Sequence, residues 1–226
     1  MPRDSTSAPA ASSTNITITR VRVFVDYWNF QLTLNERIAK SKKLADTRFQ
    51  IEWRKLGPWL AARACEAAGL SGHSFEGAHL YVSYDPRKES DKKFFGWVNS
   101  WLTKQPGLIV ECRERKPKAA PDCPECHQTI ADCPHCKRPI RPSQEKGVDT
   151  LIATDMIRLA WESAYDLAVL ATSDRDLVPA VEFLNTKGRK VVHAALPPKG
   201  ADLSSVSWAM FDVFDRYTEI ERPPVK

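Results

Sequence analysis

The chain has 226 residues, of which 42% are hydrophobic, with a formal net charge of +5 and a sequence pI of about 8.9. That apolar content is enough to bury a core, which excludes wholesale disorder, and the length suits one α/β domain with an insertion. No apolar run approaches the ~20 residues of a bilayer span, so we expect no membrane partner. The mild positive charge is compatible with a nucleic-acid partner without being diagnostic of one.

The N-terminal stretch, residues 1–18, is rich in Ser, Thr, Ala and Pro and lacks the apolar core that a signal peptide needs. We therefore expect a disordered tail there and a cytoplasmic location for the protein. In that compartment the six cysteines are expected to be thiols or metal ligands rather than disulfides.

Predicted strands alternate with predicted helices along the chain. In order, these elements are a strand at Arg20–Val25, helices at Asn29–Ala39 and Ile51–Ala68, a strand at Ala78–Tyr84, a helix at Asp91–Thr103, a strand at Leu108–Cys112, a helix opened by Glu145–Asp149 and running to about Ser163, a strand at Leu167–Ala171, a helix at Leu177–Asn185, a strand at Lys190–Ala195, and a last helix or strap at Ser205–Arg216. The alternation predicts a mostly parallel α/β sheet covered on both faces, with right-handed crossovers. We place this domain at residues 19–218 and a C-terminal tail at 219–226.

Two of the predicted strands end in carboxylates. Asp26 follows the first strand, and Asp174 and Asp176 follow the apolar run at Leu167–Ala171. The carboxyl ends of parallel strands share one edge of the sheet, where open α/β sheets bind ligands. Neighbouring carboxylates repel each other unless a hard divalent cation lies between them. The alternative is an N-cap aspartate with a solvated neighbour, and Asn29 could likewise point into the cleft or cap its helix.

Residues 113–144 differ in composition from the rest of the chain, with four cysteines, six prolines and almost no large apolar side chains. Such a segment cannot bury a core of its own and needs a staple. Its cysteines form two CxxC pairs, Cys123 with Cys126 and Cys133 with Cys136.

Four thiolates at this spacing predict a four-cysteine zinc-ribbon insertion, in which the metal serves folding rather than chemistry. His127 or His135 could replace one thiolate, and a redox pair is the alternative. The basic flanks of the insertion could grip phosphate groups or could serve solubility alone.

Three short blocks follow one another along the chain: Val23–Phe30, Glu145–Asp149 with Asp155, and Thr172–Pro179. Together they resemble the blocks of NYN domains, which are relatives of the PIN nucleases, and the chain is similar to the LabA-like branch. The resemblance covers roughly residues 20–196 and extends to a zinc-ribbon insertion before the Lys-Gly-Val-Asp block. Leu177 departs from it, because an aromatic residue is common at that position.

This resemblance implies a Rossmann-like parallel sheet, a divalent-metal site and hydrolysis of phosphodiester bonds, most often in RNA. Carried over to this chain, it implies an acidic, metal-binding and catalytic cluster, supported by Asn29 and Ser173. The cluster is Asp26, Asp149, Asp174 and Asp176.

The residues fit this chemistry, because Mg²⁺ or Mn²⁺ can neutralise a phosphodiester and activate water, so the protein needs little beyond a carboxylate cage. We predict a metal-dependent endoribonuclease in which Asn29 positions water or phosphate, and Ser173 and Lys146 contact the substrate. Asp155 ranks second, because it lies six residues beyond Asp149 and roughly 120° away around the helix axis. The alternatives are a catalytically weak RNA-binding or partner-binding module and a small-phosphate hydrolase.

Overall fold

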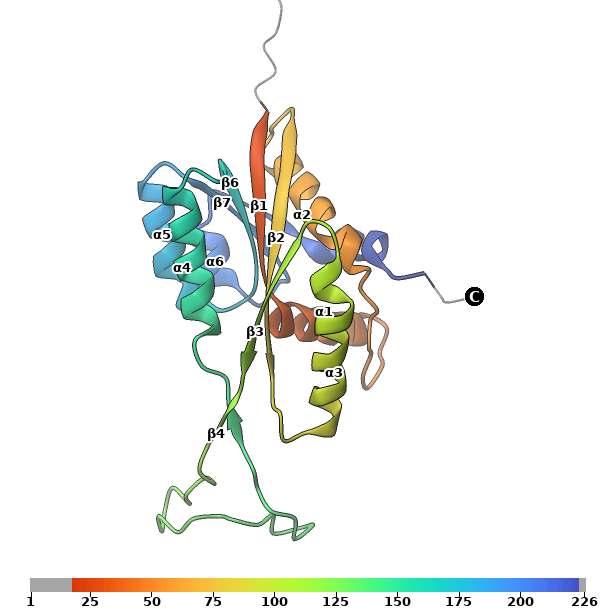
Figure 1. Cartoon of the computed structure of the whole chain (residues 1–226), viewed down its shortest axis with the longest axis vertical. Helices are drawn as coiled ribbons and strands as arrows, with labels where there is room; N and C mark the ends of the chain where they lie inside the picture. Colours follow the sequence, from red (N-terminus) through yellow and green to blue (C-terminus); the bar gives the residue numbers. More distant parts are fainter. Residues whose placement is uncertain (1–17, 224–226) are drawn as a thin grey trace, which may run out of the picture.

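Six parallel strands form one sheet in the order β3-β2-β1-β6-β7-β8 (Figure 1). The strands are β1 (Thr19–Asp26), β2 (His73–Tyr84), β3 (Leu108–Glu114), β6 (Leu167–Ala171), β7 (Lys190–Ala195) and β8 (Ala209–Asp212). This computed structural model describes residues 18–223, so the predicted disordered tail lies, apart from Ile18, outside the described residues. The predicted parallel α/β fold is confirmed.

Helices cover both faces of the sheet. They are α1 (Tyr27–Ser41), α2 (Trp53–Ala67), α3 (Glu89–Ser100), α4 (Val148–Trp161), α5 (Val178–Thr186) and α6 (Ala201–Val206), with shorter 3-10 segments η1 (Leu102–Lys104), η2 (Arg175–Leu177) and η3 (Val213–Ile220). One apolar core joins α1, α2 and α3 to the sheet, and a second joins α4, α5 and α6 to the opposite face (Figure 1). No helix within residues 18–223 is long and apolar enough to cross a bilayer.

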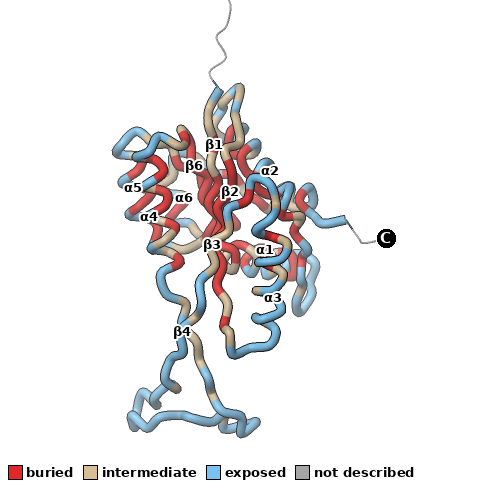
Figure 2. The backbone as a smooth tube through the Cα atoms, in the orientation of Figure 1, coloured by how far each residue is buried: buried red, intermediate tan, exposed pale blue. Residues whose placement is uncertain are grey.

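The central strands are buried on both sides, as Figure 2 shows. In β1, Val21, Val23 and Val25 join the core beneath α1–α3, whereas Phe24 joins the core beneath α4–α6. Every residue of β6 is buried, which explains its unbroken apolar run. Each fully buried valine contributes roughly 1.5–3 kcal/mol of transfer free energy. These strands are therefore firmly packed and hold the residues at their carboxyl ends in place.

The order of the strands creates a topological switch point beside β1. The chain moves from β1 outward through β2 and β3, then returns to β6 on the other side of β1 and continues outward to β7 and β8. The connections after β1 and β6 therefore diverge, and ligands of open α/β sheets bind at such a switch point. Asp26 ends β1 and Asp174 follows β6 at this point.

The C-terminal region corrects the sequence analysis. Where a helix or strap was predicted at Ser205–Arg216, strand β8 pairs in parallel with β7 and completes the sheet. A four-residue strand is too short for hydrophobic periodicity to separate it from a helix. The predicted tail also starts too early, because Ile220 is fully buried and Glu221 bridges to Ile51.

Residues 116–144 leave the domain as an exposed extension, called the arm below (Figures 1 and 2). Its base is a two-stranded antiparallel ladder of β4 (Lys116–Pro117) and β5 (Ser143–Gln144). The buried Asp85 carboxylate accepts hydrogen bonds from Arg87, whose guanidinium also donates to the Pro142 carbonyl at 3.0 Å. Polar contacts of this kind, rather than an apolar core, attach the arm to the domain.

Candidate active site

Asp26 is the last residue of β1 and the N-cap of α1. Its Oδ1 accepts a hydrogen bond from the Asn29 backbone N–H at 3.1 Å, and the residue is only 5% exposed. The predicted start of this helix at Asn29 is therefore wrong, because α1 begins at Tyr27. Asn29 is not the cap but the residue whose N–H the cap satisfies.

Asn29 instead connects the two strand ends. Its Oδ1 accepts the Ser173 backbone N–H at 2.7 Å, so the first turn of α1 is tied to the loop after β6. Thr172 adds to this link, since its hydroxyl accepts the Asp174 N–H at 3.2 Å and lies 3.5 Å from Asp26 Oδ2. These bonds fix the spacing between the carboxylates that follow β1 and β6.

Asp174 caps the short η2 segment, since its Oδ1 accepts the Asp176 N–H at 2.9 Å. Asp176 itself is exposed. The local geometry thus matches the N-cap alternative raised from the sequence. Capping uses a single oxygen of Asp174, however, so it does not prevent the carboxylate from facing a cation as well.

His193 holds the loop after β6 in place, a role that could not be inferred from local sequence patterns. Its Nε2 lies 2.8 Å from the Thr172 carbonyl and its Nδ1 lies 2.8 Å from the Ser204 hydroxyl. A carbonyl can only accept, so Nε2 carries the proton and Nδ1 accepts from Ser204. Burial lowers the pKa of His193, although the bond to Thr172 opposes this shift, and the ring is therefore neutral at pH 7.

The carboxylates from three parts of the chain influence one another. Burial is the main cause that raises the pKa of Asp26, to about 7, and the charges of Glu145, Asp149 and Asp174 raise it further against the lowering effect of the Asn29 N–H. The pKa of Asp149 is also raised, first by burial and then by Asp174, Glu145 and Asp176. The structure therefore brings Asp26, Asp149 and Asp174 into one electrostatic cluster, with Asp176 at its margin.

Glu145 is a member of this cluster that the sequence analysis missed. It stood in the Glu-Lys-Gly-Val-Asp block but was given no role. Its carboxylate accepts the Ser83 hydroxyl and pairs with Arg115 at 3.1 Å. It lies where the arm rejoins the domain, and a carboxylate four residues before Asp149 was the available signal.

Asp155 lies in a different environment from the cluster. Its Oδ2 accepts the Tyr81 hydroxyl at 3.0 Å and its Oδ1 pairs with Arg158 at 3.1 Å, beneath α4. Both oxygens thus have protein partners. Lys146 is exposed and lines a shallow hollow with Arg113 and Thr150.

The donor set of the cluster suits a hard cation. Among the described ion pairs, none involves Asp26, Asp149, Asp174 or Asp176. As they stand in residues 18–223, no three His, Cys, Asp or Glu side chains could hold one ion by direct ligation. Mg²⁺ usually binds proteins through one or two carboxylates and keeps several waters, so this arrangement is compatible with it.

The two CxxC segments of the arm form matching turns. The His127 N–H donates to the Cys123 carbonyl and the Lys137 N–H donates to the Cys133 carbonyl, both at 2.9 Å, and His127 and Lys137 share a φ of 56°. Backbone N–H groups hydrogen-bond the leading thiols and lower the pKa of Cys123 and Cys133.

These two turns do not meet, however, and Figure 1 shows them apart at the end of the arm. The four thiols are therefore not arranged as one tetrahedral site over the described part of the chain. The predicted zinc ribbon is therefore not confirmed. The arm has almost no apolar side chains, so packing alone would not bring the two turns together in the absence of an ion.

A wholly parallel sheet with helices on both faces, and acidic side chains gathered where β1 and β6 end, defines a Rossmann-like α/β protein with an acidic site at its switch point. The family model of the NYN domain matches residues 20–221, and the chain belongs to that family. This places it in the PIN-like nuclease superfamily, whose members generally hydrolyse nucleic acids.

Comparison with solved structures finds a crystal structure of a Vibrio parahaemolyticus protein of unknown function. The two chains share 13% sequence identity with a TM-score of 0.48, over 86% of this chain and 94% of the other. No functionally curated protein matches the sequence significantly.

Proposed function

We propose that this protein is a Mg²⁺- or Mn²⁺-dependent endoribonuclease that cleaves RNA at the acidic cluster. The observation that carries the proposal is the gathering of Asp26, Asp149 and Asp174, two of which have raised pKa values through burial and mutual repulsion. A divalent cation would relieve that repulsion. Family membership supports nucleic-acid hydrolysis as the general chemistry.

In this proposal Asp26, Asp149 and Asp174 hold the cation, directly or through water, and Asp176 completes the cage or orients a water molecule. A bound cation would neutralise the phosphate, lower the pKa of a bound water and stabilise the leaving oxygen. Glu145 adds negative charge on the side of the arm.

Asn29 positions the reacting groups. Because its Oδ1 is engaged by Ser173, its amide nitrogen is the group that donates to a phosphate oxygen or water. The Ser173 hydroxyl and the exposed Lys146 are proposed to contact the substrate. Asp155 is left out, because Tyr81 and Arg158 already satisfy its oxygens.

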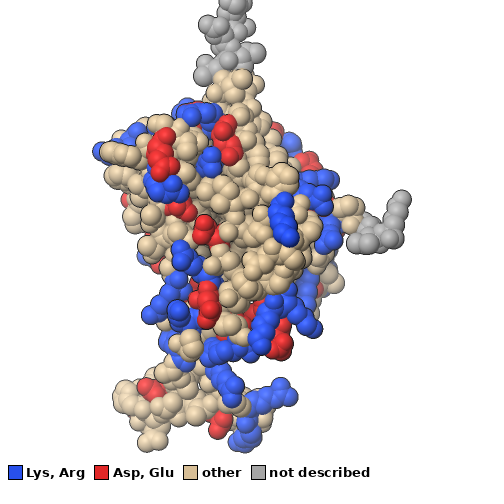
Figure 3. Space-filling view, viewed as in Figure 1, with Lys and Arg blue, Asp and Glu red and all other residues tan. Residues whose placement is uncertain are grey.

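Positive charge near the cluster supports an anionic polymer as the substrate. Lys and Arg side chains gather on the arm and the adjoining part of the domain (Figure 3). Around the base of the arm they are Arg113, Arg115, Lys116, Lys118, Arg141 and Lys146. Contacts of this kind would release counterions, so RNA affinity should fall steeply with salt.

The experiment is cleavage of an end-labelled single-stranded RNA by the full chain with Mn²⁺ and with EDTA. We expect internal cuts with Mn²⁺ only, abolished by Asp174→Asn and retained by Asp215→Asn, which removes an exposed carboxylate in η3. Binding without cleavage would favour the binding-module alternative. Turnover of a chromogenic phosphomonoester with RNA left intact would favour the small-phosphate hydrolase.

We also propose that the arm binds one structural zinc ion through Cys123, Cys126, Cys133 and Cys136. The lowered pKa values of Cys123 and Cys133 support it, because zinc binds the thiolate. Binding would require the two turns to close on each other. Elemental analysis should find about one zinc per chain, lost with Cys123→Ser plus Cys126→Ser and kept with Cys112→Ser in β3. Protein free of zinc with an intact arm would refute this.

A further inference from the structure

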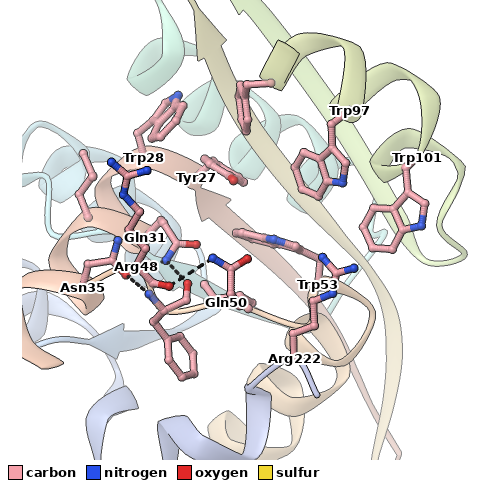
Figure 4. Close-up of a pocket in the computed structure, with 14 residues that line it drawn as sticks. Tyr27, Trp28, Gln31, Asn35, Arg48, Gln50, Trp53, Trp97, Trp101 and Arg222 are labelled. Carbon is pink, nitrogen blue, oxygen red and sulfur yellow. Dashed lines mark hydrogen bonds between the residues drawn. The ribbon is translucent and has the colours of Figure 1, made fainter. Parts of the chain in front are cut away.

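Half of the residues that line a groove on the α1 side of the sheet are aromatic (Figure 4), and they include Tyr27 and Trp28, which directly follow Asp26. Its volume is about 530 Å³, and four of the chain's seven tryptophans line it. The walls come from the first turns of α1, the start of α2, the side of α3 that packs toward α1 with Trp101 just after it, the segment before α2, and Arg222. The residues lining it are Tyr27, Trp28, Gln31, Leu32, Asn35, Arg48, Phe49, Gln50, Ile51, Trp53, Phe94, Trp97, Trp101 and Arg222.

The aromatic rings form a graded surface from the core outward. Tyr27 and Trp53 are buried and stacked, with ring centroids 4.6 Å apart. Trp28, Phe94 and Trp97 continue the surface and are only half-buried. Half-exposed indoles and phenyl rings offer flat π-faces to a ligand, which a closed core would not do.

Polar groups at the margin of the groove suit a nucleotide. Arg48 and Arg222 are exposed and lie on opposite sides of the groove in Figure 4. Neither guanidinium forms an ion pair among the described residues, so both can contact phosphates. Gln31 is held by bonds from its Nε2 to Asn35 and to the Phe49 carbonyl, which orients its Oε1 as a fixed acceptor.

The groove is joined to the acidic cluster through its own lining residues. Tyr27 and Trp28 directly follow Asp26. The Trp28 indole donates to the Ser83 carbonyl at 2.6 Å, and the Ser83 hydroxyl bonds to Glu145. The Trp28 end of the groove therefore adjoins the cluster through Ser83 and Glu145.

We propose that this groove stacks the unpaired bases of single-stranded RNA next to the cluster, which makes the enzyme selective for unpaired segments. Stacking needs an open base face, and a duplex offers none along its length. The inference rests on the proposed ribonuclease function for its biological meaning, but the binding it describes can be tested without cleavage.

The test is binding of a labelled ten-nucleotide oligouridylate to the full chain in EDTA, compared with an abasic ribose-phosphate oligomer of the same length. We expect oligouridylate to bind the wild type roughly ten-fold more tightly or better, because each stacked base adds affinity. Trp97→Leu should remove most of that difference and leave the affinity for the abasic oligomer unchanged. The matched control, Trp161→Leu in α4, removes a tryptophan that is 86% exposed and outside the groove, and should change neither.

A second variant keeps the test decisive if Trp97→Leu does not fold. Arg48→Ala with Arg222→Ala changes two exposed side chains and should weaken both oligomers, whereas Lys187→Ala on the α5 side should not. Equal affinity of the wild type for the two oligomers, or wild-type affinity in the double variant, would overturn the proposal. So would displacement of oligouridylate by an apolar peptide but not by a second RNA.

The two proposals fail differently. A chain that binds oligouridylate through Trp97 but cuts no RNA with Mn²⁺ keeps the groove and refutes the ribonuclease. A chain that cuts RNA with Mn²⁺, and whose KM for single-stranded RNA is the same in Trp97→Leu, keeps the ribonuclease and refutes the groove.

Discussion

The acidic cluster and the arm are held in place by different physical means. The cluster lies at the ends of strands buried on both faces. Asn29 and Thr172 accept hydrogen bonds from the loop after β6 and His193 donates one to it, which fixes the loop in place. The arm has little to bury and is attached by polar contacts around Arg87 and Arg115. The acidic cluster, which holds like charges close together, therefore lies on the well-packed part of the molecule. The arm, whose composition differs from that of the rest of the chain, extends from it.

The largest expected effect concerns the cluster and its use of a cation. Asp149→Asn should lower the single-turnover rate of RNA cleavage in Mn²⁺ on the order of a thousand-fold, because it removes several kcal/mol of charge stabilisation. The side chain stays the same size, so the fold should persist. A loss of less than about ten-fold in a folded variant would remove Asp149 from the site.

The second effect is on stability without a cation. Burial is the main cause that raises the pKa of the Asp26 carboxyl from 3.8 in a solvated chain to about 7 in the folded protein. Between these values the folded state binds more protons than the unfolded state, so the free energy of unfolding should fall as pH rises from about 4 to 7. The full loss, complete above pH 7, should be on the order of a few kcal/mol.

Denaturant unfolding in EDTA at several pH values measures this slope. Asp26→Asn should flatten it, because the amide still accepts the Asn29 N–H as an N-cap but carries no charge. Added Mn²⁺ should restore the free energy of unfolding that the wild type loses above pH 7 in EDTA. An identical slope in the wild type and the variant would show that ionisation of Asp26 is not the cause of the loss of stability.

The third effect tests how tightly the loop after β6 is packed. Gly200 has a φ of 75°, and a Cβ there would lie 2.9 Å from the His193 ring and 3.2 Å from the Ser173 Cα. Gly200→Ala should therefore destabilise the protein by roughly 1–3 kcal/mol. Gly188→Ala is the control, because its φ is also 75° but its Cβ would meet nothing within 4 Å. Equal losses would mean that backbone strain, and not the packing, sets the cost.

The smallest effect on the domain is expected from the arm. Cys123→Ser with Cys126→Ser should change the free energy of unfolding of the domain by less than about 0.5 kcal/mol, since both residues lie outside its cores. The same variant should be cut faster by trypsin within the arm. A large fall in Tm would mean that the arm is part of the cooperative fold.

The same contrast explains what could be predicted from the sequence. The strands and their carboxyl-end aspartates followed from local signals, namely apolar runs that stop at an acidic residue. The sequence could not reveal that Asp26 rather than Asn29 caps α1, because either residue type serves as an N-cap. Nor could it reveal β8, which is too short to show a period.

Contacts between distant residues were also beyond the sequence. Glu145 joins the cluster because the arm returns the chain to Ser83, and His193 matters only because the β7 strand lies beside β6. The aromatic groove unites Trp53 and Trp97, which lie in two separate predicted helices, with Trp28, which lies outside the predicted helices. The arrangement of the two CxxC turns, which do not meet, likewise depends on the path of the arm and not on their spacing in the sequence.

The central claim is that Asp26, Asp149 and Asp174, supplied by three distant segments, form one site for a divalent cation. Titration calorimetry with Mn²⁺ on the full chain tests it most directly. We predict a saturable site in the wild type and in Asp215→Asn, weakened at least ten-fold by Asp26→Asn, Asp149→Asn or Asp174→Asn alike. Mn²⁺ affinity that is indifferent to Asp149, or absent from the folded wild type, would contradict the claim.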